Sequence, residues 1–154
     1  MRNHIATKLK RKILAVKFLH YHNQGKQFIF LDETHLSDKY LPPYSYGKLG
    51  EKVTFEFSKK IQSLHLLAAI SENKLLGFRI FSEPITTKNY GGFIIDLLNN
   101  NKEIKNNLHN YAFFMDKSKI HTAQILKPFY RCLNVIYNAP YSPSLNPIEE
   151  VFGI

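Results

Sequence analysis

Two short apolar runs, each ending in an aspartate, constrain the fold more than any other feature of this sequence. They are FIFL over residues 28–31, followed by Asp32, and AFFM over residues 112–115, followed by Asp116. A strand with apolar side chains on both sides is typical of the middle of a sheet that helices cover on both faces. The sequence therefore predicts an α/β protein with these two runs as buried strands.

Apolar spacing predicts the remaining elements. Helices are expected over residues 5–22, 89–98 and 121–131, with a last one beginning at Ile148, and further strands over 53–57, 64–70, 75–81 and 133–137. The apolar stripe of the first helix, which we expect to face the core, consists of Ile5, Leu9, Ile13, Val16 and Leu19. An asparagine-rich stretch over residues 99–107 is expected to be a polar loop or a frayed helix end. Hairpins in the first half and alternating elements in the second predict a mixed sheet.

Length and charge narrow the class of protein. The chain has 154 residues, enough for one domain, and a single cysteine, Cys132, which we expect in the core. No apolar run is long enough to span a membrane or to act as a signal peptide, so an intracellular protein is expected. The net charge is +9, and residues 1–26 hold seven basic residues and no acidic one. Such an arm suits nucleic acid, although a solvated basic helix without a partner would have the same composition.

The two aspartates are the first candidates for a chemical site. Sites in open α/β sheets form at the carboxyl ends of strands, and parallel neighbours would place Asp32 and Asp116 about 5 Å apart. Carboxylates that close repel each other unless a proton or a cation neutralises them, and Mg²⁺ or Mn²⁺ is the usual cation. Glu149 or Glu150, at the start of the last helix, offers a third acid. These acids could equally be surface residues or helix caps.

Three segments resemble the catalytic motifs of mariner-superfamily transposases. YSPSLNPIE over residues 141–149 resembles the signature that ends in the last catalytic acid, with Ser144 where an aspartate usually stands. FLDET over 30–34 resembles the first acidic strand end, and FMDKSKIH over 114–121 the second, with Lys117 in place of the usual asparagine. The resemblance covers about residues 12–154.

The resemblance implies a ribonuclease-H-like fold, a mixed five-stranded sheet of three antiparallel strands and then two parallel ones, flanked by helices. It also implies that Asp32, Asp116 and Glu149 are the catalytic residues and the metal ligands, holding two Mg²⁺ ions about 4 Å apart, with Mn²⁺ as a substitute. The expected activity is that of a DDE endonuclease or transposase, which cleaves DNA and transfers strands between transposon ends and target. A homodimer of the full-length protein is compatible with it, and no membrane is involved.

Within this interpretation, residues 1–26 are a basic linker helix and residues 27–154 a catalytic domain truncated at its C-terminal helix, with weak nuclease activity or none. The expected compartment is the nucleus of a eukaryote or the cytoplasm of a bacterium. One alternative is an inactive or domesticated remnant that binds nucleic acid without catalysis. Another is an unrelated α/β protein whose acids solvate strand ends. Asp32 and Asp116 on adjacent strands, with Glu149 facing them, would exclude the second alternative.

Overall fold

A five-stranded mixed sheet forms the centre of the protein. The computed structural model describes residues 4–36, 50 and 63–153. Its strands are β1 (Gln27–Leu36), β2 (Leu64–Ser71), β3 (Leu75–Phe81), β4 (Tyr111–Met115) and β5 (Asn134–Tyr137), in the order β3-β2-β1-β4-β5. β1, β2 and β3 pair antiparallel, whereas β4 pairs parallel with both β1 and β5. The predicted mixed sheet is confirmed; the strand predicted over residues 53–57 lies outside the described residues.

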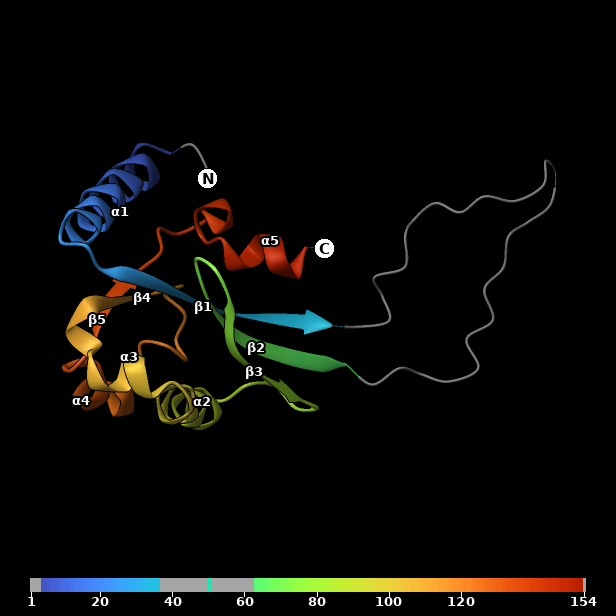
Figure 1. Cartoon of the computed structure of the whole chain (residues 1–154). Coiled ribbons are helices and arrows are strands. Elements are labelled where there is room, and N and C mark those ends of the chain that lie inside the picture. Colours follow the sequence, from blue (N-terminus) through green and yellow to red (C-terminus); the bar gives the residue numbers. More distant parts are fainter. Residues whose placement is uncertain (1–3, 37–49, 51–62, 154) are drawn as a thin grey trace.

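Helices cover both faces of the sheet (Figure 1). On one face lie α1 (Ile5–Asn23) and α5 (Ile148–Phe152), and on the other α2 (Thr87–Asn100), α3 (Lys102–Asn106) and α4 (Lys127–Tyr130). Three short 3-10 turns link these elements, at Leu108–Asn110, Gln124–Leu126 and Pro143–Leu145. No helix among the described residues is long and apolar enough to cross a membrane.

The side chains of β1 and β4 alternate between two cores, one on each face of the sheet. Ile29 and Leu31 join the core beneath α2, whereas Phe30 joins the core beneath α1 and α5, as does its neighbour Phe114. All four side chains are buried. The prediction that these two strands are buried on both faces is confirmed.

One local prediction in the second half of the chain is wrong, and another is confirmed in part. Residues 121–131 do not form one helix, because Pro128 has no amide hydrogen to donate to the preceding turn, and only a 3-10 turn and the short α4 form there. Of the two forms expected for the asparagine-rich stretch, the helix end is observed, since the stretch ends α2, and a short helix, α3, takes the place of a loop. Asn101 stabilises this junction, because its Nδ2 donates to the carbonyl oxygens of Leu97 at 2.8 Å and Leu76 at 3.3 Å.

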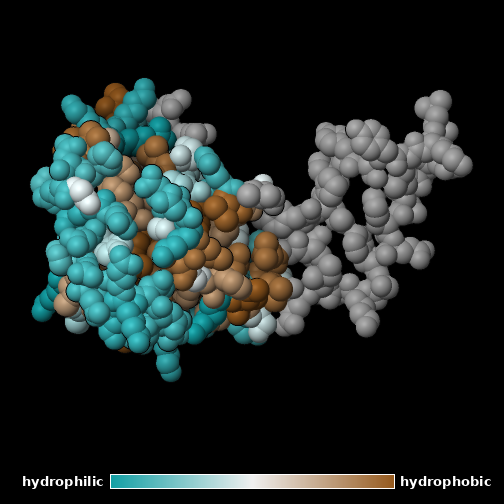
Figure 2. Space-filling view, in the orientation of Figure 1, coloured by the Kyte–Doolittle hydropathy of each residue, from teal (hydrophilic) through white to brown (hydrophobic). Residues whose placement is uncertain are grey.

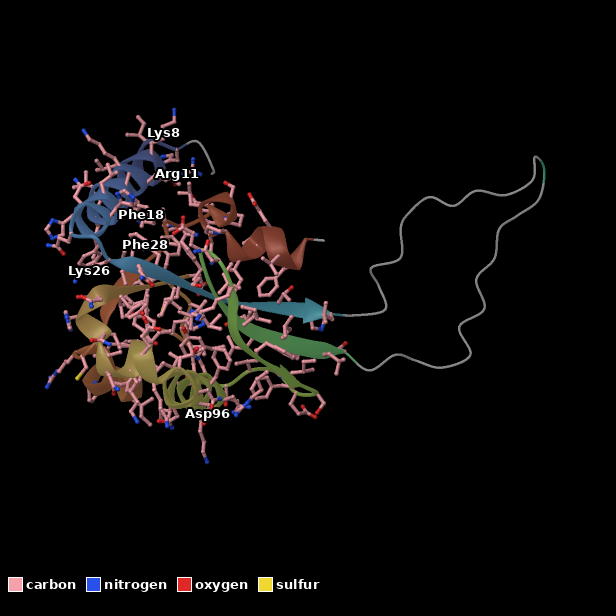
Figure 3. The ribbon with its side chains drawn as sticks, in the orientation of Figure 1. Lys8, Arg11, Phe18, Lys26, Phe28 and Asp96 are labelled. Carbon is pink, nitrogen blue, oxygen red and sulfur yellow. The ribbon has the colours of Figure 1, made fainter. Side chains whose placement is uncertain are left out.

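The orientation of α1 is the opposite of the predicted one. Its inner face carries Leu14, which is buried, and Phe18, whose ring stacks on Phe28 at a centroid distance of 4.0 Å (Figure 3). The predicted inner stripe faces outward: Ile5, Leu9, Ile13, Val16 and Leu19 are all exposed. Hydrophobic atoms accordingly appear among hydrophilic ones where α1 lies in Figure 2. Cys132 is also exposed, so the expectation that it belongs to the core is wrong.

Candidate active site

The register of the two central strands brings the predicted aspartates to neighbouring positions. Phe30 of β1 pairs with Phe114 of β4, and this is the last pair between the two strands. Asp32 and Asp116 each follow two residues later, on the face that also carries α1 and α5. β1 does not end at Asp32 as expected, because its antiparallel pairing with β2 continues to Leu36.

All three predicted acids line one cavity, with a volume of about 280 Å³. Asp32 comes from β1, Asp116 from the residue after β4, and Glu149 from α5, which contacts β1. Lys117 and the loop over residues 138–143 complete the lining. The arrangement meets the condition that excludes an unrelated α/β protein. Glu150 does not line this cavity and is exposed.

Asp32 is the acid of the cavity whose pKa is raised. Asp32 is only 9% exposed, and burial raises its pKa to about 7. The amide of Glu33 donates to Asp32 Oδ1 at 2.8 Å and partly offsets that rise, whereas the negative charges of Asp116 and Glu149 add to it.

Asn146, within the 141–149 segment, ties this segment to Asp32. Its side chain is 1% exposed, and its Nδ2 donates to Asp32 Oδ2 at 2.9 Å. The backbone carbonyl of Asn146 accepts from the backbone amide of Glu149 at 3.1 Å. One asparagine therefore connects the first acid to the start of the helix that carries the third. This role was not predicted from the sequence, although Asn146 lies within the 141–149 segment.

The 138–143 wall of the cavity is fastened to α1. Arg11 donates from Nε to Ser142 Oγ at 2.7 Å and from Nη2 to the carbonyl of Tyr141 at 3.1 Å. Asn138 Nδ2 donates to the carbonyl of Ser142 at 2.9 Å. Tyr141 adopts a φ of 55°, a left-handed conformation. The hydrogen bonds to Tyr141 and Ser142 from Arg11 and Asn138 can hold it there. Arg11 is therefore a structural residue of the site.

The basic N-terminal segment has mixed roles. Besides Arg11, Lys17 donates to the carbonyl of Val135 at 2.7 Å, and Lys26 donates to the carbonyl of His109. Partial burial lowers the pKa of Lys17. The exposed side chains of Lys8, Lys10 and Lys12 remain on α1, and Figure 3 shows Lys8 pointing away from the domain.

His121 lies beneath the site, with a side chain that is 0% exposed. Its Nε2 donates to Glu33 Oε2 at 2.8 Å, and its Nδ1 contacts Asp116 Oδ1. Burial alone would lower the pKa of His121, but the hydrogen bonds to Asp116 and Glu33 outweigh it and raise that pKa to about 9. Burial likewise acts to raise the pKa of Asp116, but the bonds from His121 and Ser118 outweigh it and lower that pKa. The stable form of the contact between His121 and Asp116 is therefore a protonated histidine beside an ionised aspartate.

The donor set of the cavity suits a hard divalent cation. Its acidic side chains offer carboxylate oxygens alone, which Mg²⁺ and Mn²⁺ prefer, and no histidine or cysteine lines it. Among the described residues, however, no three His, Cys, Asp or Glu side chains are close enough together to enclose an ion. Asp32, Asp116 and Glu149 must therefore draw together to hold one.

Comparisons with known proteins agree with this geometry. A family model described as DDE superfamily endonuclease matches residues 27–154. A Mos1 transposase paired-end complex with left transposon end has a TM-score of 0.75 and 16% identity over 97% of this chain and 48% of that chain. The Mos1 mariner paired end complex with Mn has a TM-score of 0.75 and 17% identity over 97% and 49%. The catalytic domain of Mos1 mariner transposase has a TM-score of 0.70 and 15% identity over 98% and 71%.

At these identities the structural likeness shows a shared fold. The chain spans about half the length of the two complexed transposase chains. No curated protein matches it in sequence.

Proposed function

This chain belongs to the DDE superfamily of endonucleases, and we propose that it is the catalytic domain of a DNA transposase that cleaves phosphodiester bonds and transfers DNA strands. The observation that carries the proposal is the convergence of Asp32, Asp116 and Glu149, from three separate segments, on one cavity. The sequence motifs at these same three positions support it. The proposed roles of the three acids are those of catalytic residues and metal ligands.

In the proposed reaction the three carboxylates would hold divalent cations, Mg²⁺ or Mn²⁺. A bound cation of this kind lowers the pKa of an attacking water or DNA 3′-hydroxyl and stabilises the charge on the leaving oxygen. Two solved structures with this fold are Mos1 paired end complexes, one with Mn and one with Mg. A two-metal arrangement belongs to this proposal.

The chain's own residues orient the acids and attract the substrate. Asn146 holds Asp32 by a direct hydrogen bond, so this carboxylate keeps a fixed direction towards the cavity. Lys117 lines the same cavity with a cationic side chain, which favours a phosphate group beside the carboxylates. The 138–143 wall, which Arg11 fastens, limits the open side of the cavity.

DNA is the proposed substrate and partner. The exposed Lys8, Lys10 and Lys12 give α1 a positive charge that no acidic residue of α1 offsets, and such charge binds phosphates with a strong dependence on salt. Recognition of transposon ends and target, and a homodimer of the full-length protein, are parts of the same proposal.

The test is a Mn²⁺ titration followed by thermal unfolding, comparing the parent with Asp32→Asn. Asp96→Asn is the matched control, because Asp96 is a surface carboxylate that pairs with Arg79 outside the cavity. We expect Mn²⁺ to raise the unfolding midpoint of the parent and of the control, and to leave Asp32→Asn nearly unchanged. Binding of plasmid DNA and metal-dependent nicking that Asp32→Asn abolishes are expected next. DNA binding that is indifferent to Mn²⁺, with no shift in the midpoint, would contradict the proposal.

A further inference from the structure

A cluster of three titratable side chains extends beneath the cavity, and the proposed chemistry uses only Asp116 of the three directly. His121 is fully buried between two carboxylates, with Glu33 at Nε2 and Asp116 at Nδ1. Each ring nitrogen of His121 therefore faces a carboxylate oxygen, and a ring that carries a proton on both nitrogens can donate to both. A buried charge of this kind costs free energy unless it is paired, which indicates that both contacts matter.

Glu33 cannot serve the cavity as a ligand in the way that its neighbour does. Successive side chains of a strand point to opposite faces of the sheet, so Glu33 lies on the α2 face whereas Asp32 lies on the face of α1 and α5. Glu33 is absent from the cavity lining. The one described hydrogen bond of the Glu33 side chain goes to His121, and His121 in turn contacts Asp116.

Packing and backbone contacts fix the ring of His121. It lies against the ring of Tyr90, which is also fully buried, at a centroid distance of 4.1 Å. The amide of His121 donates to Ser118 Oγ at 3.3 Å, and the amide of Ser118 donates to Asp116 Oδ1 at 3.3 Å. Because Tyr90 and the backbone contacts hold the ring, the contact of Glu33 with Nε2 helps to fix where Nδ1 meets Asp116.

The contacts of Asp116 leave one of its oxygens without a described partner. Oδ1 meets both His121 Nδ1 and the Ser118 amide, while no described contact is made by Oδ2. The side chain of Asp116 is 45% exposed and lines the cavity. Holding Oδ1 from behind therefore presents Oδ2 to the cavity.

We propose that Glu33 and His121 are positioning residues, which orient the Asp116 carboxylate so that its free oxygen faces the divalent cation. The inference rests on the proposed function, because it takes Asp116 as a metal ligand. Groups that hold a ligating carboxylate from behind commonly change metal affinity by about 10- to 100-fold when they are removed. Glu33 acts through His121, and His121 acts through Asp116.

The first experiment needs no metal. The proton on His121 Nδ1, which lies in the bond to Asp116, is observed by NMR at one fixed neutral pH in the parent, Glu33→Gln and Glu33→Ala. Glu72→Ala is the control, since Glu72 is an exposed acid in the β2–β3 turn. We expect the resonance to be sharp in the parent and the control, broadened or shifted in Glu33→Ala, and largely restored in Glu33→Gln, whose amide oxygen can still accept from Nε2.

The second experiment measures the dissociation constant of Mn²⁺ in the same four proteins by calorimetry. We expect Glu33→Ala to weaken binding about 10-fold and Glu33→Gln to weaken it less. Far-UV circular dichroism and the unfolding midpoint separate this effect from loss of fold. Should Glu33→Ala fail to fold, the parent and Glu33→Gln still decide, because a parent ring without a proton at Nε2 overturns the inference.

The outcomes distinguish the two proposals. An unchanged Nδ1 proton resonance in folded Glu33→Ala overturns the positioning role, and so does an unchanged Mn²⁺ affinity. A parent that binds no Mn²⁺ contradicts the proposed function instead, and the metal-free resonances then decide alone whether Glu33 controls the contact between His121 and Asp116.

Discussion

Replacing Asp32 with asparagine is expected to stabilise the metal-free protein above pH 7. The pKa of Asp32 rises from its ordinary value of 3.8 to about 7 on folding. Each pKa unit corresponds to about 1.36 kcal/mol, so ionised Asp32 lowers the free energy of unfolding by up to about 4 kcal/mol. An asparagine carries no charge in either state and removes this penalty.

The pH dependence follows from the direction of the shift. Between pH 3.8 and about 7 the folded protein holds a proton on Asp32 that the unfolded chain has released. The free energy of unfolding of the parent therefore falls as pH rises through this window, and the full penalty is present above it. The two proteins are expected to be similarly stable near pH 4 and to diverge as pH rises. Other titrating groups, such as His121, are present in both and affect both curves.

The site can accommodate the substitution. An amide oxygen at position 32 can still accept from the amide of Glu33, which now donates to Asp32 at 2.8 Å. The new amide nitrogen would face Asn146 Nδ2, which is also a donor. Asn146 Oδ1 is buried without a hydrogen-bond partner among the described residues, so turning the Asn146 amide over supplies the acceptor.

The assay is urea unfolding of the parent, Asp32→Asn and Asp96→Asn across this pH range, first with a chelator and then with Mn²⁺. With chelator we expect Asp32→Asn to exceed the other two above pH 7. At Mn²⁺ a hundredfold above its Kd the parent gains about 2.7 kcal/mol, and the gain is largely absent in the variant. An Asp32→Asn protein no more stable than the parent above pH 7 with chelator would refute the reasoning about charge in the cavity.

Three further predictions concern the scaffold, each measured by urea unfolding. Leu14→Ala is expected to lower the free energy of unfolding by about 2–4 kcal/mol, whereas the adjacent Ile13→Ala, on the outer face of α1, costs less than about 0.5 kcal/mol; equal losses would contradict the observed orientation. Arg79→Ala is expected to cost less than about 1 kcal/mol, because its pair with Asp96 is about half exposed, and a larger loss would be unexpected for such a pair. Gly25→Ala is expected to cost about 1 kcal/mol, because φ there is +70° and nothing lies within 4 Å of an added Cβ; a stabilised variant would be evidence against that backbone conformation.

The central strands were predictable because their physical signal is local. A continuous apolar run, such as the one that precedes each aspartate, predicts burial on both faces of the sheet, and the structure provides it for β1 and β4. The face of α1 was not predictable, since the helix carries two apolar stripes half a turn apart. The spacing of apolar residues shows that a helix has an apolar stripe, but not which stripe packs against the sheet. The shorter stripe, with Leu14 and Phe18, faces the sheet because the ring of Phe18 stacks on Phe28.

In the candidate site, the acids could be predicted from the sequence, whereas the contacts that support them could not. Strand ends and motif resemblance indicated Asp32, Asp116 and Glu149, and the structure brings them to one cavity. The supporting contacts left no local signal, because the partners lie far apart in sequence. Asn146 reaches across 114 positions to Asp32.

The pairing of β1 with β4 also determines when the site can exist during synthesis. Asp32 is made before the strand that becomes its parallel neighbour, because residues 111–115 follow β1 in the chain, and Glu149 follows both. Closing such long chain segments is slow compared with forming local contacts. A nascent chain therefore carries its acids apart, and they meet only when the sheet is complete and α5 has packed on β1. In the proposed endonuclease, the cavity with its three acids is therefore assembled only after Glu149 has been made.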